Sequence, residues 1–67
     1  MWHPVSSTNV DAIMYDSGWL YIRFKDMSVY QYDDVPISVY LDLLGASSKG
    51  RFCHEYVAHT YKYTKIS

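Results

Sequence analysis

The segment "WLYIRFK", residues 19–25, decides the fold because its side chains alternate between two characters. One face of an extended chain would carry three apolar side chains, Leu20, Ile22 and Phe24. The other face would carry two rings and two cations, Trp19, Tyr21, Arg23 and Lys25. A period of two is typical of a β-strand with one buried face. The segment therefore predicts a strand that packs on a core through its apolar side.

Turn signals on both sides extend this strand into a sheet. Residues 16–18 (Asp-Ser-Gly) and 26–28 (Asp-Met-Ser) have the side chains and backbone freedom that favour tight reversals. The β-branched and aromatic segments beyond them, residues 10–15 and 29–35, predict two further strands. Because the connections are short, we expect the three strands to form an antiparallel meander.

After residue 35 the spacing of apolar residues changes from that of a strand to that of a helix. Pro36 suits the first turn of a helix, and Gly45 suits its end. Apolar side chains between them occupy positions i, i+3, i+4 and i+7: Ile37, Tyr40, Leu41 and Leu44. These signals predict an amphipathic helix.

A second helix is expected to follow, because the hydroxyl of Ser47 or Ser48 can accept a hydrogen bond from a free first-turn N–H. Its buried stripe would be Phe52, Tyr56 and Val57. The last alternating segment, "TYKYTKI" (residues 60–66), is expected to be extended.

The predicted fold class is α+β: a three-stranded antiparallel β-meander with two C-terminal helices packed on one face. A chain of 67 residues forms a single domain, residues 1–67, with a small core. The expected core residues are Ile13 or Met14, Leu20, Ile22, Phe24, Leu41, Leu44 and Phe52.

The composition excludes several classes of protein. A hydrophobic content of 49% with 18% aromatic residues is too apolar for a disordered chain. A net charge of −1 argues against coating DNA through bulk charge. A single cysteine, Cys53, permits no internal disulfide, which favours a reducing, cytoplasmic location. No secretory leader or membrane-spanning segment is expected.

The charges divide along the chain. The first 46 residues contain two basic and six acidic side chains, whereas four basic side chains oppose Glu55 alone from Ser47 onward. If "SSKG" (47–50) opens a helix, free N–H groups beside these cations would favour a phosphate. The predicted anion or nucleic-acid contacts are Ser48, Lys49, Gly50, Arg51, Lys62 and Lys65. The alternative is a solvated turn between two helices.

Aromatic side chains supply a second candidate surface. The outer row of the central strand, Trp19, Tyr21, Arg23 and Lys25, combines rings and cations suited to stacking on unpaired bases. The alternatives are ordinary cross-strand packing and a subunit interface. Tyr30 and Tyr32 share one face of a strand, and we expect them to pack between the layers.

Catalytic and metal sites are not expected. Ser48, His54 and Asp42 supply the residue types of a catalytic triad, but no strained nucleophile turn accompanies them. His3, His54, His59 and Cys53 lack the paired spacing of a zinc site. We therefore expect a non-enzyme without a cofactor, in which Cys53 is a small core residue.

The chain resembles the KTSC domain, named for an extension at the C-terminus of some lysyl-tRNA synthetases. The resemblance runs from Val5 to about Tyr63 through "LYIRF", "VYQYDDVPISVY" and "LLGASSKGRF". Its most specific residues are Tyr30-Gln31-Tyr32, Val35-Pro36, Tyr40, Ala46, Ser48, Gly50 and Phe52. Residues 26–28 replace the family's usual glycine turn, and Cys53-His54 replaces a Phe-Asn-like pair. The resemblance implies a free-standing small protein of bacteria or phage, and attachment to a synthetase suggests RNA binding.

Two functional hypotheses follow. The first is a non-enzymatic module that engages RNA or a nucleic-acid-handling complex through the basic residues and outer rings. The alternative is a protein-binding adaptor, for instance a phage inhibitor of a host nucleic-acid machine, acting through aromatic and acidic side chains such as Asp33-Asp34. Homodimerisation through the outer sheet face or an edge strand remains a third possibility.

Overall fold

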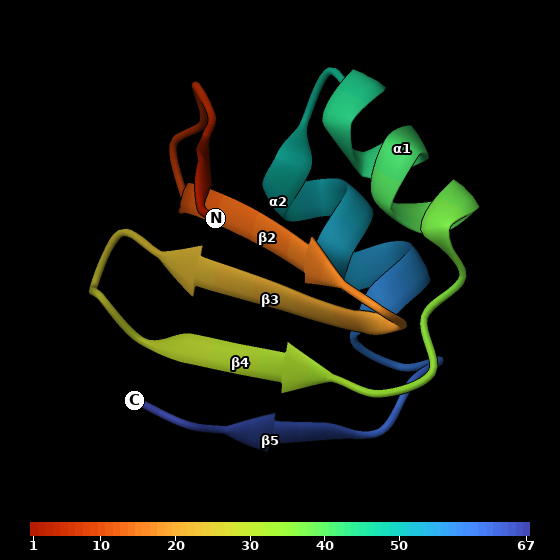
Figure 1. The fold of residues 1–67 in the computed structure, drawn as a ribbon. Helices are drawn as coiled ribbons and strands as arrows, with labels where there is room; N and C mark the ends of the chain where they lie inside the picture. Colours follow the sequence, from red (N-terminus) through yellow and green to blue (C-terminus); the bar gives the residue numbers. More distant parts are fainter.

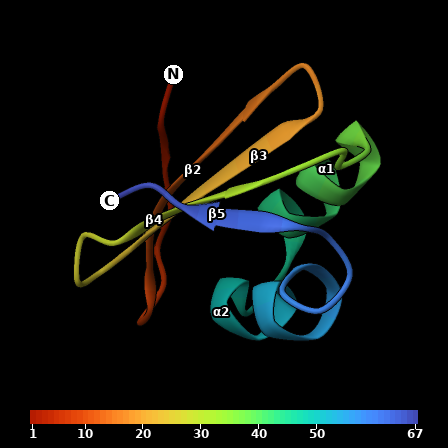
Figure 2. The same ribbon diagram turned by 90° about the horizontal axis from the view of Figure 1, so that it is seen from below.

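A computed structural model describes residues 1–67 as one antiparallel sheet with short helices on one side (Figures 1 and 2). The sheet order follows the chain, β1-β2-β3-β4-β5. Its strands are β1 (His3–Pro4), β2 (Val10–Asp16), β3 (Trp19–Phe24), β4 (Val29–Tyr32) and β5 (Tyr63–Lys65). The helical segments are α1 (Ile37–Gly45), α2 (Lys49–Phe52) and a π-helical turn, η1 (Cys53–Val57).

The α+β class is confirmed, but the expected three-stranded meander understates the sheet. The three strands that local patterns predict are β2, β3 and β4, and two more strands flank them. β1 pairs with β2 through only two residues, and β5 brings the C-terminal segment back beside β4 (Figure 1). Both added strands are short and gain their order from a partner strand, so local sequence carries little signal for them.

The β2–β3 hairpin forms because its loop accepts positive backbone φ angles. Ser17 has φ 49° and Gly18 has φ 92°, as a two-residue type I′ turn requires. Farther along the hairpin, the register shifts between Val10 and Ala12, so Asp11 is the extra residue of a β-bulge. The bulge brings the Asp11 carboxylate to the guanidinium of Arg23, with 2.8 Å between Oδ2 and Nε.

The core lies between the sheet and the helices. Directly paired residues such as Ile13 and Ile22 share a face, and both are fully buried. Of the core expected from sequence, Ile13, Leu20 and Ile22 are buried, while Phe24, Leu44 and Phe52 are partly buried and pack against the cluster. The nine-residue buried cluster comprises Val10, Ile13, Leu20, Ile22, Tyr32, Val35, Leu43, Cys53 and Val57.

The buried face of α1 differs from the expected one. Leu43 is 0% exposed, whereas Leu41 and Ile37 are 56% and 58% exposed. The prediction that Ile37 and Leu41 belong to the buried stripe of this helix is therefore wrong. The helix is rotated about its axis so that Tyr40 stacks on Tyr15 of β2, with 5.3 Å between the ring centroids. This rotation directs Leu43 into the core.

The second helix exists but is not one regular α-helix. α2 is capped by Ser48, whose hydroxyl accepts a hydrogen bond of 3.3 Å from the Arg51 N–H. After one turn it widens into η1, which carries Cys53 and Val57 into the core. Cys53 is a buried core residue, and burial raises the pKa of its thiol to about 12.

Candidate functional site

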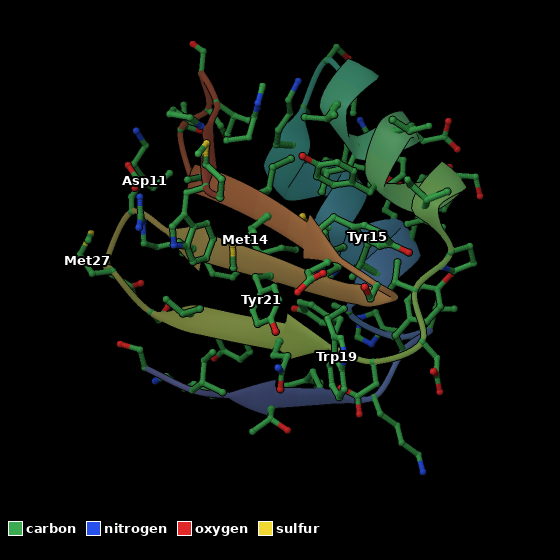
Figure 3. The ribbon with its side chains drawn as sticks, in the orientation of Figure 1. Asp11, Met14, Tyr15, Trp19, Tyr21 and Met27 are labelled. Atoms are coloured by element: carbon green, nitrogen blue, oxygen red, sulfur yellow. The ribbon has the colours of Figure 1, made fainter.

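The outer face of the sheet, opposite the helices, holds the predicted row of rings and cations only in part. Figure 3 shows Met14, Tyr21 and Trp19 over the strands on this face. Arg23 is committed within the chain, because it pairs with Asp11 and its guanidinium carbon lies 4.7 Å from the centre of the Trp2 ring.

Two further contacts organise this face. The Gln31 side chain donates a hydrogen bond of 3.0 Å to the Tyr21 hydroxyl. Lys25 follows the end of β3 and lines a groove that the helix-facing ring of Phe24 also lines, so it does not continue the outer row. Trp19, 40% exposed, is the ring of this row with the most open surface.

The start of α2 gathers four of the predicted anion contacts but uses some of them internally. The Lys49 ammonium donates hydrogen bonds of 2.6 Å to the Ala46 carbonyl and 3.1 Å to the Leu44 carbonyl, at the end of α1. Arg51 donates to Glu55 at 2.7 Å, and this hydrogen bond is the largest cause of its raised pKa. Because that ion pair is largely exposed, it contributes little to stability and is easily exchanged.

The other two predicted basic contacts, Lys62 and Lys65, lie apart from Lys49 and Arg51. Lys65 is the cross-strand partner of Tyr30, so the two side chains share the helix-facing side of the sheet. Lys62 precedes β5 and lies beside Asp33 and Asp34. The predicted residues thus do not form one basic patch.

A groove on the helix-facing side brings several of these residues together. The helices leave part of β4 uncovered near the β3–β4 turn, and the space between β4 and α2 has a volume of about 590 Å³. We call it the β4 groove, lined by Asn9, Phe24, Lys25, Asp26, Ser28, Tyr30, Tyr32 and Gly50.

One wall of the β4 groove is aromatic. The Phe24 ring meets the Tyr30 ring edge to face at 5.7 Å, and Tyr30 and Tyr32 stack at 6.4 Å. Tyr63 of β5 lies against both tyrosines at 5.6 and 5.9 Å. The expected packing of Tyr30 and Tyr32 between the layers is confirmed by the burial of Tyr32 and the partial burial of Tyr30, and both rings also line the groove.

The opposite wall is formed by Asn9 and Gly50. A Cβ atom added to Gly50 would lie 3.1 Å from Asn9 Nδ2, so the absence of a side chain lets α2 approach this loop. Asn9 is held by its backbone: its carbonyl accepts a hydrogen bond of 2.8 Å from the Lys25 N–H, and its own N–H donates to Ser7 Oγ at 3.3 Å. Its side-chain amide faces Gly50 without an internal hydrogen bond.

The rim of the β4 groove carries both signs of charge. Lys25 and Asp26 line it. The Asp26 carboxyl has a lowered pKa, chiefly because the hydroxyl and N–H of Ser28 both donate to Asp26 Oδ1, and Lys65 lowers it by a smaller amount. Lys25 and Asp26 balance each other within the lining, and Lys65 adds a cation beside it on the neighbouring strand.

Sequence reasoning grouped Gly50 and Lys65 with an anion site and assigned Tyr30 and Tyr32 to packing. Their meeting in one groove was missed, together with Asn9, Asp26 and Ser28. The available signal was the positive charge downstream of Ser47 beside a tyrosine-rich strand, but only the pairing of β5 with β4 places them together.

Two properties of the whole chain bear on its chemistry. No three side chains of His, Cys, Asp or Glu gather as a metal-ion site would need. None of the helices has both the length and the apolar character required to cross a bilayer.

Comparison with known proteins gives a consistent result. A family model described as the KTSC domain matches residues 6–61. The chain aligns over its full length with 97% of a KTSC domain protein crystallised from Yersinia pestis, with a TM-score of 0.93 and 33% identity. A protein of Tsukamurella paurometabola is 38% identical over 61 residues, which cover 88% of this chain and 91% of the relative.

The same segment is similar to part of a much larger enzyme. A lysine–tRNA ligase of Trichormus variabilis is 38% identical over 48 residues, and one of a Nostoc strain is 35% identical over 48 residues. In each case the match covers 72% of this chain but only 9% of the ligase.

Proposed function

The chain belongs to the KTSC domain family, and from this premise we propose that it is a small non-enzymatic module that binds single-stranded RNA through the β4 groove. The observation that carries the proposal is the combination in one groove of the partly buried Phe24 and Tyr30 rings with Lys25, next to Lys65 on the neighbouring strand. Proteins that bind single strands combine aromatic surfaces for stacking with cations for the backbone.

Each component of the groove has a role in this proposal. Tyr30 and Phe24 offer apolar ring surface to a base, and a stacked base contributes roughly 1 to 3 kcal/mol. Lys25 and Lys65 contact neighbouring phosphates. Gly50 has no side chain to crowd the facing wall, where an added Cβ atom would lie 3.1 Å from Asn9 Nδ2.

RNA is favoured over DNA by the relatives. Lysine–tRNA ligases, which contain a similar segment, carry tRNA in their names. Since that segment spans only 9% of their length, their activity is not transferred to this chain. The association supports RNA as the class of partner and leaves the particular RNA to experiment.

The test is a fluorescence anisotropy titration with short unstructured RNA at several salt concentrations. Each phosphate contact contributes about −0.7 to the slope of log K against log salt for a single strand. We expect Lys25→Ala and Lys65→Ala each to weaken binding and to flatten the slope by about that amount.

Lys62→Ala is the matched control, because Lys62 is adjacent to β5 but lies beside Asp33 and Asp34 rather than at the groove. If Lys62→Ala weakened binding as much as the other two changes, Lys62 would also contact a phosphate, as the sequence predicts. Absence of binding tighter than millimolar at low salt would remove RNA binding altogether.

A second candidate function is a protein-binding adaptor or a phage-encoded inhibitor of a host nucleic-acid machine. The observation that favours it is the exposed Trp19 ring beside Met14 and Tyr21 on the outer face (Figure 3). Aromatic anchors of this kind are enriched in protein interfaces. In a pull-down from host lysate, this function predicts a protein that Trp19→Ser loses and that nuclease treatment does not release.

A further inference from the structure

We propose that the β4 groove receives one unpaired RNA base, and that the Tyr32 hydroxyl and the Asn9 side-chain amide read the edge of that base. This inference rests on the proposed function and adds the identity of the bound unit and of the two groups that select it. It follows from the hydrogen bonding, burial and position of Tyr32.

The hydroxyl of Tyr32 has no partner within the chain, although the residue is only 4% exposed. The Tyr15 hydroxyl, by contrast, donates to the Val35 carbonyl at 2.6 Å, and the Tyr21 hydroxyl accepts from Gln31. A buried hydroxyl usually finds a hydrogen bond, since leaving it unpaired is costly. Tyr32 is therefore an exception that needs a partner from outside the chain or from solvent.

The same hydroxyl is not sealed inside the core. Among buried side-chain polar atoms without a hydrogen bond, Asp33 Oδ1 is the one shut off from solvent. The Tyr32 hydroxyl is not in that state, so it reaches accessible space, and the β4 groove is the cavity that Tyr32 lines. With this placement the hydroxyl would offer one donor and one acceptor to the groove, from a ring that packing holds in place.

The hydroxyl keeps its proton under physiological conditions. The pKa of Tyr32 is raised to about 12, mainly by burial and to a smaller extent by Cys53, Tyr30 and Tyr63. The group therefore acts as a neutral hydrogen-bond donor and acceptor at neutral pH, suited to a ring nitrogen or an exocyclic oxygen or amine of a base.

Asn9 faces this hydroxyl's groove from the opposite wall, next to Gly50. Its amide supplies one acceptor and two donors, and the bonds of its backbone to Lys25 and Ser7 fix the loop that carries it. A flat ring placed against Phe24 and Tyr30 would meet apolar surface on its face and polar groups at its edge. An unpaired base has this combination, whereas an apolar peptide side chain would leave both polar groups unpaired.

The size and charge of the groove agree with a single nucleotide unit. Its volume of about 590 Å³ exceeds what one base fills and leaves space for a sugar. Lys25 in the lining and Lys65 beside Tyr30 on the neighbouring strand would contact the phosphates that flank such a base. A free mononucleotide offers the same chemistry, so the experiment must separate it from a strand.

The experiment compares wild type, Tyr32→Phe and Asn9→Ala in binding four pentaribonucleotides that differ only in the central base, with an abasic centre as reference. The four free mononucleotides are titrated in parallel by NMR. Tyr32→Phe removes only an unpaired hydroxyl, so its stability should match wild type. Tyr61→Phe is the matched control, since Tyr61 lies outside the groove.

We expect wild type to prefer one base over the others and over the abasic centre, and Tyr32→Phe and Asn9→Ala each to reduce that preference roughly three- to tenfold, as the loss of a hydrogen bond does. Unchanged ratios between the bases in both variants, with strand binding intact, would overturn the inference and leave the proposed function standing. Binding of mononucleotides without strands would support the base site but refute the RNA-binding function. If neither strands nor mononucleotides bind, both proposals fail.

Discussion

The Lys49 ammonium lies 2.6 Å from the carbonyl oxygen of Ala46, the residue that caps the C-terminal end of α1. Helix ends leave carbonyl groups without intrahelical partners, and a cation there is favourable. Lys49 therefore connects the start of α2 to the end of α1. A side chain that looked like a phosphate contact in the sequence has a structural role in the fold.

This contact predicts that Lys49→Met, which keeps most of the apolar stem, lowers the free energy of unfolding by about 1 kcal/mol. RNA affinity should change less than it does in Lys65→Ala. Urea denaturation and anisotropy measure the two effects. Lys62→Met, at an exposed lysine without such a bond, should leave stability unchanged. A Lys49→Met variant with full stability but abolished RNA binding would restore the phosphate role expected from sequence.

Met27 in the β3–β4 turn provides a prediction of increased stability. Its φ angle is 71°, in a region where a side chain is strained, and the residue is 59% exposed. Met27→Gly should relieve this strain with little loss of packing and stabilise the chain by about 0.5 kcal/mol, after the greater entropy of glycine in the unfolded state is subtracted. Met27→Ala, which keeps a Cβ atom, is the control. Equal unfolding midpoints for the two variants would contradict the assignment of strain.

The rotation of α1 is tested by a matched pair of leucines. Leu43 is 0% exposed and Leu41 is 56% exposed, although they are two residues apart on one helix. Leu43→Ala should cost about 2 to 5 kcal/mol and unfold much of so small a domain. Leu41→Ala should cost well under half as much. Thermal and urea unfolding measure the two losses of stability. A larger loss for Leu41→Ala than for Leu43→Ala would support the stripe of Ile37 and Leu41 instead.

Alkaline pH should destabilise the chain through two buried acids. Tyr32 and Cys53 both have a pKa raised to about 12, from ordinary values of 10.0 and 9.0. The unfolded chain therefore loses these protons first as pH rises, and stability falls by linkage. The contribution is fully present below about pH 9 and is lost as pH approaches 12.

Urea unfolding midpoints measured from pH 8 to pH 11 check this effect. The double variant Tyr32→Phe/Cys53→Ala lacks both titrating groups, so its midpoint should fall less steeply with pH than that of wild type. Its absolute stability is lower because Cys53→Ala leaves a small cavity, so the slopes are compared rather than the midpoints. Parallel slopes would show that other groups control alkaline unfolding.

Much of the fold was predictable because its signals are local. The alternation of residues 19–25 and the Ser17-Gly18 turn specify the β2–β3 hairpin within a few residues; the turn is confirmed, and the strand is confirmed as far as Phe24. β5 was foreseen only as an extended segment. Its three residues become a strand through pairing with β4, a contact between distant parts of the chain that no periodicity records.

The orientation of α1 was not predictable from spacing alone. Tyr40 and Leu44 belong both to the expected stripe with Ile37 and Leu41 and to the observed one with Val39 and Leu43. Stacking of Tyr40 on Tyr15 selects the second stripe. The helical spacing is compatible with either stripe, and the choice between them depends on this tertiary contact.

The candidate site shows the same limit. The sequence identified tyrosines on one strand and cations near the C-terminus, but it gave them separate roles. Tyr30 lines one groove with Gly50 and pairs across strands with Lys65, because α2 packs against the Asn9 loop and β5 returns beside β4. Once these long-range pairings are known, charge and ring chemistry are enough to propose a nucleic-acid groove.

The most direct test of this account is NMR mapping of the ¹⁵N-labelled chain during titration with a short single-stranded RNA. We predict that the largest shift changes occur at the groove residues Asn9, Tyr30, Tyr32 and Gly50 and at Lys65 beside them. Trp19 and Tyr21 on the outer face should change little. Changes confined to the outer face, or no changes at millimolar RNA, would contradict the assignment of RNA binding to the β4 groove.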